Sequence, residues 1–179
     1  TLDAEKRGRA GLYRYDRRGL TRLFGGLDTS NGLAFAPDGR AFYHADTPHH
    51  RVTRYAYDPD RGEITGAEVF LEIPPVAPDR ARPDGGAVDA EGCYWSAMFE
   101  GGRVERYSPK GELLASLPVP ALSPTMPCFG GPDLRTLYVT TVRDPANAEA
   151  IERFPASGGL FALRLDVPGH PRPPFDPEA

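Results

Sequence analysis

The sequence has 179 residues, of which 40% are hydrophobic and 26% are charged, and a formal net charge of −4. This length suits one domain with a substantial core, and the composition excludes an intrinsically disordered chain. The charge balance implies no basic face and no apolar run approaches the ~20 residues of a membrane span, so neither nucleic acid nor a membrane is expected as a partner.

Predicted strands follow one another in short pieces along the whole chain, separated by turns rich in the twenty Gly and twenty Pro residues. The stretch "GLYRYDRRGLTRLF" near the N-terminus matches the last two strands of a repeating unit. Three further units begin at Asn31, Asp84 and Cys128, which are 53 and then 44 residues apart. Each has a short strand, a turn and a second strand rich in aromatic or β-branched residues, and a third strand follows after a loop.

This repeat predicts an all-β fold, and its spacing favours a β-propeller of four-stranded antiparallel blades over a β-sandwich of unrelated meanders. The chain is long enough for an incomplete ring of about three and a half blades in a single domain. The best helical candidate is the short stretch Ala146 to Arg153. The predicted division is the end of one blade over 1–30, blades over 31–82, 83–123 and 124–169, and a C-terminal tail over 170–179.

Asn31 and Asp84 occupy the same place in successive repeats, at the start of the first strand. That strand is the innermost of a propeller blade, so the two side chains would converge at the mouth of the central channel. An amide oxygen and a carboxylate suit a hard divalent cation whose shell is completed by further ligands and water. The alternative is that both residues only cap the entrances of their strands, as Asn and Asp often do in turns.

The loops between second and third strands would return to the same face and ring this mouth, which makes them natural substrate contacts. They cover 46–50, 99–102 and 143–158. Arg143 could bind sugar hydroxyls there or form a structural ion pair with Asp144. His44 could reach a substrate from the mouth.

A competing metal site is the stretch "HADTPHH", in which His44 and Asp46 share a strand face and His49 and His50 follow a Pro turn. Such a cluster could hold a transition metal. The spacing does not imply the required geometry, however, and adjacent histidines in a surface loop are usually only polar. Cys93 and Cys128 stand in no paired metal spacing and favour free thiols in a reducing compartment, which predicts a cytoplasmic protein.

The motif Asn31-Gly32-Leu33, followed by Pro83-Asp84-Gly85, resembles the SMP-30/gluconolactonase/regucalcin-like family. Further matches, in the right order, are "DAEGCYWSAMFEGGRVERYSPKGELL", "CFGG" with "LYVTTVRD", and "SGGLFAL". The resemblance implies a six-bladed propeller with a central divalent cation, which would be Ca²⁺ or else Zn²⁺, Mg²⁺ or Mn²⁺. It also implies hydrolysis of sugar lactones such as gluconolactone.

The resemblance assigns metal binding to Asn31 and Asp84, and makes Asp84 the proposed general base. The opening "TLDAE" looks like a family stretch with an acidic residue near the substrate, which makes Glu5 a weaker candidate. The family's metal-binding Glu and its substrate-holding R-x-N-D-G motif have no counterpart in this sequence. The chain therefore resembles the C-terminal portion of a member, and its partners would be a sugar lactone and either the missing N-terminal half or another copy at open blade edges.

A metal-dependent lactonase is the function that these residues favour. The alternatives are a non-catalytic propeller that serves as a scaffold or calcium-binding protein, and a fragment that is inactive without the upstream blades.

Overall fold

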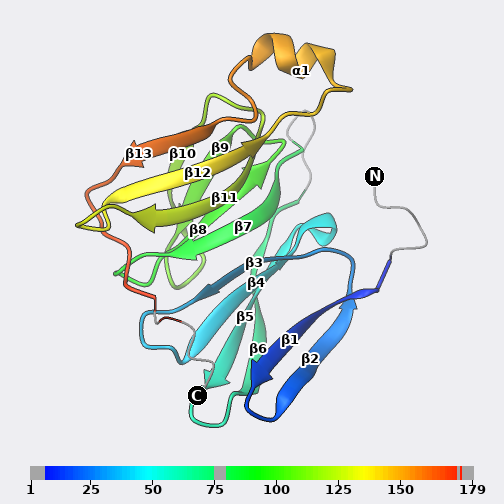
Figure 1. The fold of residues 1–179 in the computed structure, drawn as a ribbon, viewed down its shortest axis with the longest axis vertical. Helices are drawn as coiled ribbons and strands as arrows, with labels where there is room; N and C mark the ends of the chain where they lie inside the picture. The colour runs from blue at the N-terminus through cyan, green and yellow to red at the C-terminus, as the bar shows by residue number, and fades with distance from the viewer. Residues whose placement is uncertain (1–6, 75–79, 173, 175–179) are drawn as a thin grey trace.

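The computed structural model describes residues 7–74, 80–172 and 174, and these form four antiparallel sheets with little helix (Figure 1). The predicted all-β class is confirmed. Within these residues, no helix combines the length and the apolar composition that crossing a membrane would take.

The first sheet is a two-stranded hairpin that packs beside the next sheet. Phe24 of the hairpin stacks on Tyr55 at 5.0 Å between ring centroids, and Tyr55 stacks in turn on Phe42 at 4.9 Å. This row of rings joins the hairpin to its neighbour through aromatic burial. The hairpin strands are β1 (Ala10–Asp16) and β2 (Gly19–Leu27).

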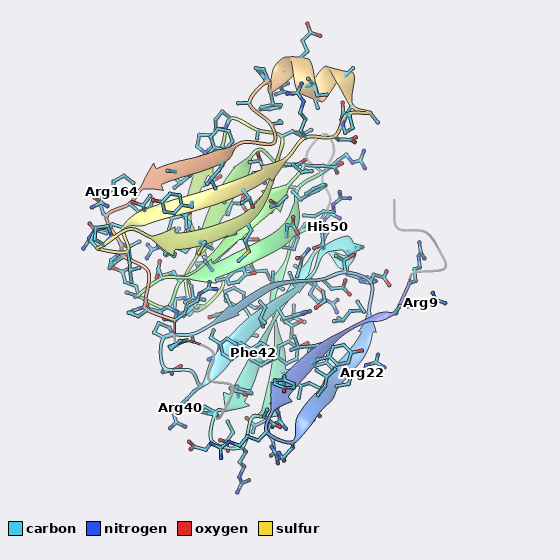
Figure 2. The ribbon with its side chains drawn as sticks, in the orientation of Figure 1. Arg9, Arg22, Arg40, Phe42, His50 and Arg164 are labelled. Carbon is cyan, nitrogen blue, oxygen red and sulfur yellow. The ribbon has the colours of Figure 1, made fainter. Side chains whose placement is uncertain are left out.

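A four-stranded sheet follows, in the order β3-β4-β5-β6, so that each strand pairs with the next one in the chain. Figure 2 shows Phe42 on this sheet and His50 at the end where β5 begins. Val52 of this sheet is fully buried. The strands are β3 (Ser30–Phe35), β4 (Ala41–Asp46), β5 (Arg51–Asp58) and β6 (Glu63–Glu72), with a 3-10 turn η2 (Thr47–His49) between β4 and β5.

The next sheet repeats this pattern in the order β7-β8-β9-β10. Asp89, in the turn after β7, is fully buried and ties the turn to two strands: its carboxylate accepts hydrogen bonds from Trp95 Nε1 at 2.9 Å and Arg106 Nε at 2.8 Å. The strands are β7 (Arg82–Val88), β8 (Tyr94–Phe99), β9 (Arg103–Tyr107) and β10 (Leu113–Pro118).

The last sheet has three strands in the order β11-β12-β13. The predicted helix lies in the loop before β13 but begins two residues later than expected, because Asn147 is its N-cap and accepts a hydrogen bond from Ala150 N at 3.0 Å. The elements are β11 (Ser123–Gly130), β12 (Thr136–Val142), α1 (Ala148–Arg153) and β13 (Leu160–Arg164).

The first strands of the three larger sheets lie side by side and begin on the same side of the molecule, as Figure 1 shows for β3 and β7. Two apolar layers hold the sheets together. Tyr43 and Tyr94 meet between the first two at 4.9 Å, and Trp95 packs with Leu137 and Val139 between the last two. Rigid packing of neighbouring sheets thus fixes the starts of their inner strands relative to each other.

Candidate functional site

Inner strands β3 and β7 come close enough at Gly32 to require a glycine. Gly32 has a φ of +59°, and a Cβ added there would lie 2.5 Å from Tyr94 Oη and 3.0 Å from the Asp84 carbonyl oxygen. Tyr94 Oη also donates a hydrogen bond to the Gly32 carbonyl at 3.0 Å. Asn-Gly is usually a hairpin turn between two strands. Here the pair lies at the start of β3, because Gly32 is the contact point between two sheets.

Both inner strands also carry an irregularity next to the predicted ligands. Pairing of β3 with β4 shifts register between Asn31 and Ala34, and pairing of β7 with β8 shifts between Pro83 and Gly86. Such bulges bend a strand and re-aim its side chains, and they recur beside active sites.

The result is a direct contact between the two residues that the sequence singled out. Asn31 Nδ2 donates hydrogen bonds to Asp84 Oδ1 and, at 3.1 Å, to Thr47 Oγ1 of η2. Asn31 and Asp84 are 53 residues apart in the chain and belong to different sheets, and the structure brings them together.

Burial dominates the electrostatics of Asp84. Loss of water around the carboxylate raises its pKa from 3.8 to about 6, and the positive charge of Arg82 opposes this shift. A carboxyl group with such a pKa can accept a proton near neutral pH and release it again, which is what a general base has to do.

Asn31 and Asp84 line a cavity of about 380 Å³, within the usual range for small-molecule sites. Thr47 of η2 also lines this cavity. The loop between β4 and β5 therefore reaches the cavity, as expected for a loop between a second and a third strand. The sequence reasoning missed two cationic lining residues, Arg7 and Arg82. Arg82 could have been found from the sequence, because it precedes Asp84 by two residues in a predicted strand, where alternate side chains share a face.

His44 lies elsewhere, and the structure corrects the expectation that it reaches the mouth. Its imidazole is 2% exposed, lies edge-on to Phe24 at 5.7 Å and places Nε2 2.7 Å from Ser30 Oγ. Burial in this setting lowers the pKa of His44. The side chain faces the N-terminal hairpin because packing of β4 against Phe24 selects that side.

The competing histidine cluster does not form a metal site in the part of the chain that the structure covers, where no group of three or more His, Cys, Asp or Glu side chains is placed to hold an ion. Instead, His49 Nδ1 lies 2.9 Å from Asp46 Oδ2, and Asp46 Oδ1 accepts a hydrogen bond from Thr29 N at 3.0 Å. These contacts secure the loop.

A further predicted substrate contact, Arg143, is not among the residues that line this cavity. Arg143 Nη1 donates to the Pro155 carbonyl at 3.3 Å and so holds its own loop. Glu5 lies outside the described residues.

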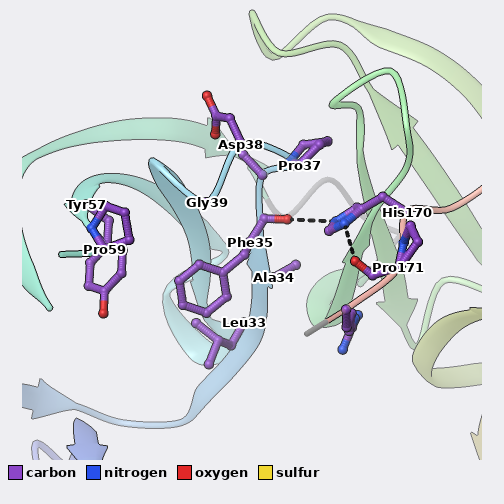
Figure 3. A pocket seen from close by; sticks show the side chains of 12 residues that line it. Leu33, Ala34, Phe35, Pro37, Asp38, Gly39, Tyr57, Pro59, His170 and Pro171 are labelled. Atoms are coloured by element: carbon purple, nitrogen blue, oxygen red, sulfur yellow. Dashed lines mark hydrogen bonds between the residues drawn. The ribbon is translucent and has the colours of Figure 1, made fainter. Parts of the chain in front are cut away.

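A larger cavity of about 570 Å³ lies at the other end of β3 (Figure 3). Phe35, Pro37 and Pro171 are among its walls, and His170 Nε2 lies 3.2 Å from the Phe35 carbonyl oxygen. Its walls are largely apolar and it does not contain the Asn31–Asp84 pair. We therefore take the smaller, polar cavity as the candidate site.

The donor set fits part of a shell for a hard divalent cation. Asn31 supplies an amide oxygen and Asp84 a carboxylate, which are the oxygen ligands that Ca²⁺ and similar ions take. Six or more oxygens are usual around Ca²⁺, so water and other groups would have to supply the rest.

Antiparallel sheets whose first strands lie side by side are the architecture of propeller blades. The chain belongs to the SMP-30/gluconolactonase/LRE-like family, whose model matches residues 1–143. Its structure superposes on a calcium-binding protein, regucalcin, from Agrobacterium tumefaciens with a TM-score of 0.84 and 33% identity, covering 94% of this chain and 57% of that one. The fold is therefore that of part of a β-propeller, as predicted.

Curated relatives include two lactonases. The chain is 46% identical to a 6-deoxy-6-sulfogluconolactonase from Pseudomonas putida, over 86% of this chain and 52% of the relative. It is 40% identical to a pentonolactonase from Haloferax volcanii, over 92% of this chain and 56% of the relative. The chain thus spans just over half the length of these proteins.

Proposed function

We propose that the protein hydrolyses sugar lactones with water as the nucleophile and Asp84 as the general base. The observation that carries this proposal is the contact of Asn31 with Asp84 inside a cavity where burial raises the pKa of the carboxyl group to about 6. Relatives named as lactonases support the substrate class.

Asp84 would accept the proton of the attacking water as the new C–O bond forms. Breaking of the ring C–O bond, with transfer of that proton from Asp84 to the leaving oxygen, then gives an aldonic acid, which ionises to the aldonate and releases a proton to the solvent. Asn31 and Asp84 would hold a divalent cation, which when bound supplies polarisation of the lactone carbonyl and acidification of water. Thr47 fixes the Asn31 amide through its hydroxyl oxygen, so Asn31 need not reorganise during the reaction.

We place this activity in the cytoplasm. Cys93 is buried and Cys128 exposed, and both are free thiols. Unpaired cysteines are typical of a reducing compartment.

The test is acid release from glucono-1,5-lactone by the full-length protein, followed with a pH indicator and corrected for spontaneous hydrolysis. Turnover should disappear with a chelator and return with one of Ca²⁺, Zn²⁺, Mg²⁺ or Mn²⁺. A protein that binds the ion and remains folded, but hydrolyses neither this lactone nor a pentonolactone with any of the four, would favour the calcium-binding scaffold instead.

A further inference from the structure

Arg82 presents an oriented guanidinium group to the cavity. Its Nη2 lies 2.9 Å from Glu100 Oε2, and its Cζ lies 5.1 Å from the centre of the Phe99 ring, which also lines the cavity. These two contacts hold the guanidinium group in place. Its Nε is buried without a hydrogen-bond partner. Arg82 is therefore a preorganised cationic donor in the cavity wall.

Arg7 brings a second positive charge to the same cavity. The segment that carries it is tied to the mouth by a hydrogen bond of 2.7 Å from Gly8 N to Asp28 Oδ1. That bond also engages the carboxylate of Asp28, the other acidic residue beside Asp84 in the cavity wall.

We infer that the site takes a sugar lactone with an anionic substituent, such as a phosphate or carboxylate, bound by Arg82 with help from Arg7. Arginine suits both anions because its guanidinium group stays charged and donates charge-assisted hydrogen bonds. This inference rests on the proposed function and adds the class of substrate.

The charges also fix which way such a substrate lies. Asp84 repels an anion when it is ionised, so the anionic group belongs at the arginines and the lactone carbonyl at Asp84. A cavity of about 380 Å³ has room for a ring and a substituent together.

The experiment compares kcat/KM for 6-phosphoglucono-1,5-lactone and glucono-1,5-lactone in the full-length protein and in Arg82→Gln. The wild type should prefer the phosphorylated lactone, and Arg82→Gln should lower this preference about 10- to 100-fold, mainly through KM, since one charge-assisted hydrogen bond is lost. Arg82→Lys, which keeps the charge without the guanidinium group, should fall between them.

Arg80→Gln is the matched control. Arg80 Nε also faces Glu100 Oε2, at 3.6 Å, but its side chain is 75% exposed and is not part of the cavity wall. It should leave the preference unchanged, whereas Arg7→Gln should lower it. Thermal unfolding of each variant checks that the fold is kept.

Two results would overturn the inference: a wild type without preference for the phosphorylated lactone, or an equal loss on both lactones in Arg82→Gln. If neither lactone is hydrolysed, the proposed function fails. The inference about anion binding is then tested separately, by calorimetry of product binding. Binding of 6-phosphogluconate well above that of gluconate, lost in Arg82→Gln, would sustain it, and equal binding of the two would reject it.

Discussion

Asp84→Asn should stabilise the metal-free protein at neutral pH. Burial raises the pKa of Asp84 from 3.8 to about 6, so the folded state favours the neutral carboxyl group. For a group with a raised pKa, the stabilising contribution is fully present below pH 3.8 and is lost as the pH rises through about 6. Above that pH the wild type carries a buried charge that the asparagine variant does not.

The size of the effect follows from the shift of about two pKa units. Each unit corresponds to about 1.4 kcal/mol, which gives about 3 kcal/mol at most. Asp84 is only partly buried, and solvent screening reduces this to about 1–2 kcal/mol. In a domain of this length such a gain raises Tm by about 2–8 °C. Asparagine can still accept the hydrogen bond from Asn31, so that contact need not be lost.

The assay is urea and thermal unfolding of wild type and Asp84→Asn with a chelator present, at pH 7.5 and at pH 4. The variant should be more stable at pH 7.5, and most of this advantage should vanish at pH 4. Asp60→Asn, in an exposed turn, is the control and should show little change at either pH. A variant that is no more stable at pH 7.5, or equally stabilised at both, would refute the reasoning.

Two further substitutions test the packing that positions the site. Gly32→Ala should destabilise the fold by about 2–4 kcal/mol in urea unfolding, because a Cβ would lie 2.5 Å from Tyr94 Oη at a φ of +59°; a loss below 0.5 kcal/mol would mean that β3 and β7 do not pack this closely. Asp89→Ala should cost about 3–5 kcal/mol by the same measurement, because Cys93 N, Trp95 Nε1 and Arg106 Nε all lose their buried acceptor; near-wild-type stability would show that the turn does not depend on this carboxylate.

Local patterns in the sequence suffice for the strands and for the Asn31–Asp84 pair. Turn residues and alternating apolar residues mark each strand, and the repeat fixes which strand of each sheet comes first. Because equivalent positions of neighbouring repeats lie side by side, two polar residues at such positions were predicted to meet. The contact between Asn31 Nδ2 and Asp84 Oδ1 agrees with that expectation.

The remaining features depend on packing between sheets, which the sequence does not encode locally. His44 faces inward because Phe24, twenty residues earlier, covers that side of β4. Arg82 faces the cavity in an orientation set by Glu100 and Phe99 at the end of the neighbouring strand. Strand alternation places Arg82 on the face of Asp84, but the orientation of its guanidinium group and the side taken by His44 result from contacts between distant segments.

The central claim is that Asp84 is the base in lactone hydrolysis, and turnover of Asp84→Asn in the full-length protein at saturating cation tests it most directly. Calorimetry on the same samples establishes how much cation the variant binds. The variant should keep its fold and lose about 100- to 10,000-fold in kcat, because asparagine offers an oxygen but cannot accept the proton. Near-wild-type turnover with the cation bound would contradict the claim.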